Sequence, residues 1–136
     1  MYSPFPKESK INKFIMSKKK PYCECLNTVK PVRDTLEVIN GKWKLSIIIS
    51  VGVGNSRFTE IQESISGLTP KVLSKELKEL EQHQLIKRVI TNDYPVKISY
   101  ILEPYADTLT PIIYAMKDWG LNHKKKIFQE DISAQL

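Results

Sequence analysis

The chain has 136 residues, which is enough for one domain with a hydrophobic core and too few for two ordinary domains. Hydrophobic residues make up 41% of it and charged residues 26%, which excludes a wholly disordered chain and a fibrous repeat. The net charge of +6 favours an anionic partner, such as nucleic acid or a membrane surface.

Most of this charge lies in the first 30 residues, which contain seven lysines and two glutamates. They also contain three prolines and no sustained apolar period, so the segment is predicted to be unstructured up to about Lys30. The run Lys18–Lys20 fits either a solvated tail or an arm that contacts phosphate. Met16 resembles an ordinary start of translation, and residues 1–15 are therefore expected to be an upstream extension.

The N-terminal charges are not followed by an apolar run of seven or more residues, and no stretch of 18 apolar residues occurs. Neither a secretory signal nor a membrane span is therefore predicted. We expect a cytoplasmic protein with no membrane partner.

Cys23 and Cys25 are the only cysteines, too few for a disulfide framework and too close together for a relaxed bridge. The two histidines, His83 and His123, stand alone, so no metal and no cofactor are expected. Lysines near the cysteines favour the reactive thiolate. Two interpretations stay open, namely unreactive thiols and redox-sensing thiols that respond to an oxidant or form an intersubunit disulfide.

Apolar spacing predicts two helices after the tail. The first begins at Pro31 and stops at Asn40–Gly41. The second covers residues 42–51 and is apolar nearly all round, which is typical of a core helix. Its segment Ile47–Ile49, taken alone, also fits a strand.

A turn at residues 52–55 precedes a third helix. Arg57–Phe58 allows at most a very short strand. Thr59 and Gln62 then match a capping box, which predicts a helix that starts at Thr59 and ends at Gly67.

Thr69 and Pro70 suit the N-cap and first position of a fourth helix, over residues 69–82. Two short helices joined by a three-residue connection are what a helix-turn-helix requires, with the fourth as recognition helix. Its leucines recur four and three residues apart and turn inward. The alternative is an ordinary amphipathic surface helix, which has the same pattern. The opposite, polar face carries Lys71, Ser74, Lys75 and Lys78.

Residues 86–102 predict a β-hairpin. Ile86 to Thr91 is rich in β-branched residues, Asn92–Asp93 marks a turn, and the segment 96–102 alternates apolar and polar residues. Pro95 lies near the tip, where a missing backbone donor is tolerated. A helix-turn-helix followed by a hairpin is a winged helix, so we predict a mainly α (α+β) fold with a two-stranded wing.

The last predicted helix starts at Glu103–Pro104, runs to about Phe128, and is kinked or split at Pro111. Its apolar stripe is longer than so small a domain needs, which predicts a homodimer held by N- and C-terminal dimerisation helices. The stripe consists of Leu109, Ile112, Ile113, Met116, Trp119 and Ile127. The predicted division is a flexible basic tail (1–24), a DNA-binding and dimerisation domain (25–128) and a C-terminal tail (129–136).

From about Pro31 to Trp119 the chain resembles the HxlR-type winged-helix transcriptional regulators, relatives of the MarR group. The combination of a Gly-Lys-Trp triplet, an Arg-Phe pair and the leucine spacing is specific for that family. The resemblance implies a bacterial dimer that binds palindromic operators with helix 69–82 in the major groove, and repression as the commoner outcome. The matching residues are Pro31–Val32, Leu36, Ile39, Gly41–Lys42–Trp43, Arg57–Phe58, Glu60–Ile61, Ile65, Gly67–Leu68, Leu73, Leu77, Leu80–Glu81, Pro95, Tyr100 and Trp119.

The chain departs from the family at three positions. Members that sense oxidants typically carry a cysteine immediately before the Pro-Val pair, where this chain has Lys30. Ser99 replaces the usual acidic residue before the strand tyrosine, and Glu103 replaces the usual threonine that opens the last helix. The effector, a small molecule or an oxidant, is therefore left open.

We expect Lys71, Ser74 and Lys75 to contact base edges, because N-terminal residues of a recognition helix reach deepest into the groove. Phosphate contacts are predicted for Thr69, Lys78, Lys97 and Arg57, the last with an acidic neighbour as the alternative partner. Trp43 and Trp119 are interpreted as core or dimer packing residues.

The sequence thus predicts a dimeric, sequence-specific DNA-binding transcriptional regulator, with double-stranded operator DNA as its partner. The alternative is a winged-helix protein-interaction module that binds no DNA. An enzyme is not expected, since the histidines have no Ser, Cys or paired carboxylate at motif spacing and no glycine-rich phosphate loop is present.

Overall fold

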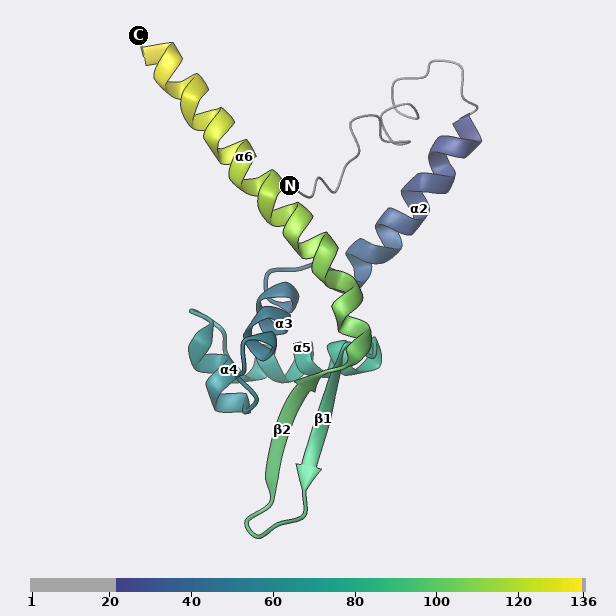
Figure 1. Cartoon of the computed structure of the whole chain (residues 1–136), viewed down its shortest axis with the longest axis vertical. Coiled ribbons are helices and arrows are strands. Elements are labelled where there is room, and N and C mark those ends of the chain that lie inside the picture. The colour runs from purple at the N-terminus through teal and green to yellow at the C-terminus, as the bar shows by residue number, and fades with distance from the viewer. Residues whose placement is uncertain (1–21, 136) are drawn as a thin grey trace. The chain divides into compact units, whose positions relative to one another are not determined.

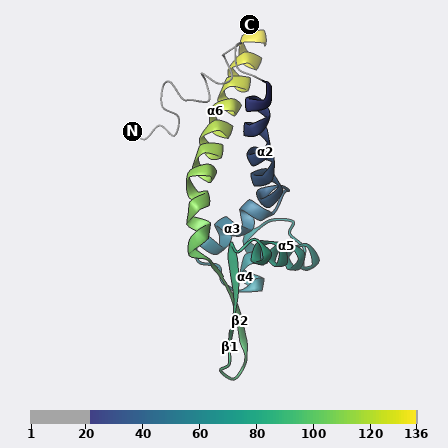
Figure 2. The same ribbon diagram turned by 90° about the vertical axis from the view of Figure 1, so that its right-hand side faces the viewer.

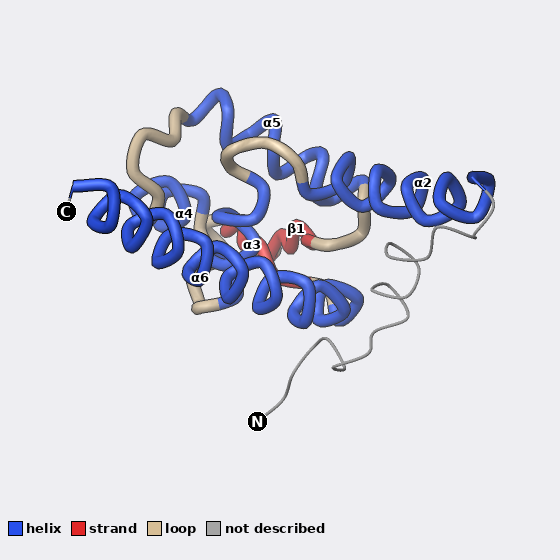
Figure 3. The backbone as a smooth tube through the Cα atoms, turned by 90° about the horizontal axis from the view of Figure 1, so that it is seen from above, coloured by secondary structure: helices blue, strands red, loops and turns tan. Residues whose placement is uncertain are grey.

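The computed structural model describes residues 22–135, which fall into two compact units, residues 22–106 and residues 107–135. The predicted mainly α winged helix is confirmed, with helices in blue and the paired strands in red in Figure 3. In chain order the elements are α2 (Tyr22–Ile39), α3 (Lys44–Gly52), α4 (Phe58–Ser64), α5 (Pro70–Gln82), β1 (Ile86–Thr91), β2 (Lys97–Leu102), a 3-10 helix η1 (Pro104–Leu109) and α6 (Thr110–Gln135) (Figure 1).

Helix α2 begins at Tyr22 and includes Pro31 in its interior. The prediction of a helix that starts at Pro31, after an unstructured segment up to Lys30, is therefore wrong for residues 22–30. The apolar period extends N-terminally across the proline, because Val29 lies on the same helix face as apolar residues that follow Pro31. The predicted stop is confirmed, since Gly41 has a φ of 89°, in the left-handed region that favours glycine.

The core of the first unit lies between α3, α4, α5 and the base of the hairpin. Ile47 of α3, Ile61 of α4 and Leu73 and Leu80 of α5 are each 0% exposed, and Ile86 at the start of β1 is 2% exposed. These residues come from every element of the unit except α2 and β2. The core helix predicted over residues 42–51 is confirmed, although it begins at Lys44 with Trp43 as its N-cap, and so are the inward-facing leucines of the recognition helix.

Helix α4 begins earlier than predicted. Its N-cap is Arg57, and a carboxylate oxygen of Glu60 accepts hydrogen bonds from the backbone N–H groups of Ser56 (3.1 Å) and Arg57 (3.3 Å). The capping box predicted at Thr59 and Gln62 is wrong, and the pair Arg57–Phe58, for which at most a very short strand was expected, forms the start of α4. Glutamate reaching back to an earlier residue satisfies the N–H groups that the predicted box would have left free.

The α4–α5 connection is residues 65–69, so the predicted three-residue connection is too short. Helix α4 ends at Ser64, not at Gly67, and Gly67 has a φ of 82° in the turn. The hydroxyl oxygen of Thr69 accepts a hydrogen bond from the Val72 N–H (3.3 Å), and Pro70 opens α5, as predicted.

The hairpin is antiparallel, with a register that runs from Ile86 opposite Leu102 to Thr91 opposite Lys97. The backbone N–H of Tyr100 donates to the carbonyl of Ser56 (2.7 Å), which ties the hairpin to the start of α4. Beyond this tie the hairpin extends away from α3, α4 and α5 (Figure 2). The predicted two-stranded wing is thus confirmed and is anchored at its base.

The second unit consists mainly of α6. Pro111 is the second residue of α6, and the preceding segment forms η1, so the expected division of this segment near Pro111 is confirmed. The helix ends at Gln135, not at about Phe128, and residues 129–135 of the predicted C-terminal tail are helical. None of its residues is buried. Among the described residues, none of the helices is long and apolar enough to span a membrane.

Candidate nucleic-acid interface

The predicted base-reading residues lie on one exposed face of α5. Leu73, Leu77 and Leu80 turn inward and are at most 1% exposed, because their spacing of four and three follows the helical repeat. The same repeat places the polar residues on the opposite side. Lys71, Ser74, Lys75 and Lys78 are all exposed.

The residues predicted to contact phosphate come from three elements. Thr69 lies at the N-terminus of α5, with its hydroxyl oxygen already engaged in the cap. Lys97 is exposed and begins β2. Arg57 is exposed just before α4, and its side chain forms no ion pair with another described residue. The acidic partner weighed for Arg57 is therefore not found within residues 22–135.

Strand β1 adds two cations that the sequence reasoning did not select. Lys87 and Arg88 are both exposed. Successive strand residues point to opposite faces, so Lys87 shares a face with Lys97 while Arg88 lies opposite Tyr100 on the other face. The sequence indicates this arrangement, because two adjacent basic residues in a predicted strand lie on opposite faces of the hairpin.

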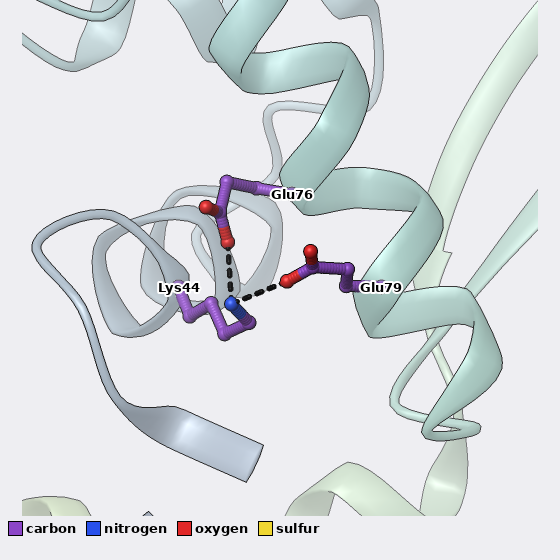
Figure 4. Close-up of polar contacts among 3 residues, drawn as sticks. All are labelled: Lys44, Glu76 and Glu79. Carbon is purple, nitrogen blue, oxygen red and sulfur yellow. Dashed lines mark ion pairs between the residues drawn. The ribbon is translucent and has the colours of Figure 1, made fainter. Parts of the chain in front are cut away.

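An ion-pair cluster, largely buried, joins Lys44 of α3 to Glu76 and Glu79 of α5 (Figure 4). The Nζ atom of Lys44 lies 2.7 Å from a carboxylate oxygen of Glu76 and 2.6 Å from one of Glu79. Lys44 is 7% exposed, although it begins a helix that is otherwise apolar. This cluster was not predicted from the sequence.

The cluster favours the charged forms of its members. Burial by itself lowers the pKa of Lys44, but hydrogen bonds and attraction from Glu76 and Glu79 outweigh it and place the pKa above the ordinary value of 10.5. The hydrogen bond from Lys44 lowers the pKa of Glu79 below its ordinary value of 4.5, with attraction to Lys44, Lys75 and His83 adding to the effect. Lys44 and Glu79 therefore remain ionised between these values.

Helices α2 and α6 expose apolar side chains in rows. On α2 the row consists of Val29, Val32 and Leu36, which are 42%, 52% and 51% exposed. Of the predicted stripe, Leu109 is buried and lies in η1 and Ile113 is half-buried, whereas its other members are exposed on α6. Trp119, at 66%, stacks on His123 with ring centroids 4.7 Å apart. Trp119 is therefore not a core residue within the described chain, and its role in dimer packing stays a prediction.

Helix α6 carries a second apolar row that the sequence analysis missed. Tyr114, Leu121, Phe128 and Ile132 are separated by seven, seven and four residues and are 45% to 64% exposed. At 3.6 residues per turn this row lies on roughly the opposite side of α6 from Trp119. A helix with apolar residues on two sides needs two apolar neighbours to bury them.

The backbone of Cys23 and Cys25 lies in α2, and their side chains lie outside the part of the chain that the structure describes. The run Lys18–Lys20 and the start at Met16 also lie outside the described residues. Within residues 22–135, no group of three His, Cys, Asp or Glu side chains is placed to hold a metal ion.

The geometry matches a known family. The family model described as HxlR-like helix-turn-helix matches residues 38–128. The chain belongs to the HxlR family. The matched residues include all of the helix-turn-helix and the hairpin, and the resemblance noted from the sequence is thereby confirmed.

Relatives of this HxlR-family chain are transcriptional regulators. The HTH-type transcriptional regulator YdeP of Bacillus subtilis (strain 168) is 37% identical over 97 residues, covering 71% of this chain and 76% of YdeP. YtcD of the same strain, also an HTH-type transcriptional regulator, is 35% identical over 102 residues, covering 75% of this chain and 81% of YtcD.

Solved structures of the same kind superpose on the HxlR-family chain. The crystal structure of YtcD has a TM-score of 0.66 and 37% identity, and covers 69% of this chain and 96% of YtcD. The redox regulator HypR in its reduced form has a TM-score of 0.64 and 35% identity, and covers 69% of this chain and 93% of HypR. The chain is accordingly a DNA-binding transcriptional regulator and not an enzyme.

Proposed function

We propose that this HxlR-family chain acts as a homodimer that reads a palindromic operator, with α5 in the major groove and the β1–β2 hairpin as wing. The observation that carries the proposal is the exposed face of α5. Lysine and serine side chains at the N-terminal end of such a helix can reach base edges, whereas more distant cations set the register on phosphates. The wing extends from the same unit and adds Lys87, Arg88 and Lys97.

Dimerisation is supported by the exposed apolar rows on α2 and α6. Side chains such as Trp119 and Phe128, 66% and 64% exposed, are costly to leave in water and enriched in subunit interfaces. A two-fold dimer would set two copies of α5 about 34 Å apart, one turn of DNA. A palindromic operator would then match the symmetry of the protein.

We further propose that the dimer is a repressor and that an oxidant is a candidate effector. The family resemblance favours repression, and HypR, a structural relative, is a redox regulator. In this chain the thiols available for such chemistry are Cys23 and Cys25. They are separated by one residue, so a disulfide would more readily join two subunits than close within one.

The DNA contact is tested by Lys75→Ala. If Lys75 reads a base, operator binding weakens by about 1–3 kcal/mol and binding to random DNA weakens less. Fluorescence anisotropy with a labelled duplex from the promoter region beside this gene, and with a random duplex, measures both affinities. Lys78→Ala is the matched control, because a phosphate contact costs the same on both duplexes.

An equal loss on both duplexes for Lys75→Ala would reassign Lys75 to phosphate. A wild-type affinity that does not fall with rising salt would contradict DNA binding through α5 and favour the protein-interaction alternative. Size measurement of the wild-type chain by light scattering tests the dimer independently of any DNA.

A further inference from the structure

Helix α5 carries as many acidic as basic residues, which is unfavourable for an element that binds DNA. Its residues 70–82 contain three lysines and three glutamates, so the helix by itself carries no net charge. Carboxylates next to phosphates are repelled, and on a helix surface they also attract lysines three and four residues away. Glu79 lies four residues after Lys75, and attraction between the two already contributes to the low pKa of Glu79.

Lys44 of α3 pairs with two of these three carboxylates along the flank of α5, between its leucine face and its lysine face. Glu76 and Glu79 are three residues apart and therefore lie side by side on the helix, where a single Nζ atom reaches both at 2.7 and 2.6 Å. Lys44 is almost fully buried, whereas Lys75 and Lys78 are exposed, and the helical repeat places Glu79 next to Lys75 on the helix surface. Figure 4 shows both glutamates turned toward Lys44 from successive turns of α5.

We propose that Lys44 is a positioning residue of the DNA interface, which holds Glu76 and Glu79 away from the lysine face and keeps Lys75 free to contact DNA. The inference rests on the proposed role of α5. Without Lys44, the Glu79 carboxylate can pair with Lys75, and the positive charge that offsets the two glutamates near the phosphates is lost. Lys44 thus acts on DNA binding through the glutamates and does not touch DNA itself.

The test is Lys44→Met, measured as anisotropy with a labelled random-sequence duplex so that no operator need be known. We expect affinity to fall about three- to tenfold at about 0.05 M salt, and the deficit to shrink at about 0.3 M because exposed charges are screened. Lys42→Met is the matched control, since Lys42 is exposed, lies over the Trp43 ring and is not paired with α5. It removes the same charge two residues away and should leave affinity within about twofold.

Restoring DNA affinity in a second variant distinguishes neutralisation of the glutamates by Lys44 from a purely structural role of Lys44. The triple variant Lys44→Met, Glu76→Gln, Glu79→Gln lacks both carboxylates that pair with Lys44, and we expect it to bind DNA within about twofold of the wild type. Glu79→Gln alone should bind as well as the wild type or more tightly, whereas loss of a purely structural contact would weaken binding. Circular dichroism melting confirms that each variant is folded.

Two results would overturn the inference. One is Lys44→Met with wild-type affinity for the random duplex while Lys75→Ala binds the promoter duplex weakly, which leaves the proposed role of α5 intact. The other is a folded triple variant that remains as weak as Lys44→Met. If neither Lys75→Ala nor Lys44→Met changes DNA affinity, the proposed role of α5 fails as well.

Discussion

Helices α5 and α6 both carry apolar and charged residues, but they differ in what buries the apolar ones. In α5 the three leucines are at most 1% exposed, and their neighbours are supplied by α3, α4 and the hairpin base of the same chain. In α6 no residue is buried, and large side chains on two sides of the helix remain exposed. An apolar stripe was predicted on both helices, yet only α5 has its apolar face completed within its own unit.

The difference assigns the two helices to different levels of organisation. The position of α5 is set by the folding of one chain, whereas the apolar rows of α6 can be buried only by further apolar surface. Substitutions in α5 should therefore act on the free energy of unfolding or on DNA affinity. Substitutions in α6 should act on association between chains.

Leu77→Ala should have the largest effect, because Leu77 is 1% exposed and its removal leaves a cavity between α5 and α3. We expect the free energy of unfolding to fall by about 2–5 kcal/mol in urea denaturation. Leu121→Ala on α6 is the matched control, since Leu121 is 51% exposed. At protein concentrations too low for dimers it should cost less than about 0.5 kcal/mol. Equal costs would abolish the contrast between the two helices.

Trp119→Ala should act on the dimer. Large aromatic side chains at subunit interfaces cost about 2 kcal/mol or more when truncated, so the dissociation constant should rise about thirtyfold or more. Sedimentation velocity over a range of protein concentrations measures this shift. Asn122→Ala, a change at an exposed polar position of the same helix, should leave the constant unchanged. A dimer that tolerates the loss of Trp119 would move the interface to another surface.

Thr69→Ala removes the N-cap of α5 and should cost about 0.5–2 kcal/mol of unfolding free energy. Thr59→Ala is a sharp comparison, because the sequence pattern predicted a cap at Thr59 and the structure places it inside α4. It should cost less than about 0.5 kcal/mol. Thermal melting of the two variants distinguishes the predicted cap from the observed one, and the reverse order would restore the sequence prediction.

The pH dependence of the Lys44 cluster should be the smallest effect, since Glu79 is partly exposed to solvent. The pKa of Glu79 is lowered in the folded state, so its stabilisation is present above pH 4.5 and is lost as the pH falls through the folded-state pKa. The raised pKa of Lys44 gives stabilisation that is present below pH 10.5 and is lost as the pH rises through the folded-state pKa.

The melting temperature of the wild type minus that of Lys44→Met measures this contribution. We expect the difference to be constant between these two pH values and to narrow outside them. A difference that does not vary with pH would mean that Lys44 stabilises the fold through packing alone.

The sequence predicted the elements whose local pattern agrees with their surroundings. The leucine spacing and the Thr69–Pro70 start were sufficient for α5, and alternation with a turn at Asn92–Asp93 was sufficient for the hairpin. Errors arose where local signals compete. The pairs Thr59–Gln62 and Arg57–Glu60 both have the spacing of a capping box, and only the folded turn selects Glu60.

The lysine face of the candidate site was predictable because the helical repeat fixes which residues lie opposite buried leucines. The Lys44 cluster was not predictable, because it depends on how α3 crosses α5, and residues 32 and 35 positions apart in sequence meet there. The second apolar row of α6 was hidden by the first, since apolar residues on two sides of a helix leave no single amphipathic stripe to detect.

The two apolar rows of α6 also affect how long a newly made chain survives in the cell. A chain without a partner leaves Tyr114, Trp119 and Phe128 exposed, which is the kind of surface that chaperones and proteases recognise. Because assembly depends on chain concentration, sparse chains would be degraded before pairing while abundant ones survive. Doubling the rate of synthesis of such a regulator would then more than double its cellular concentration.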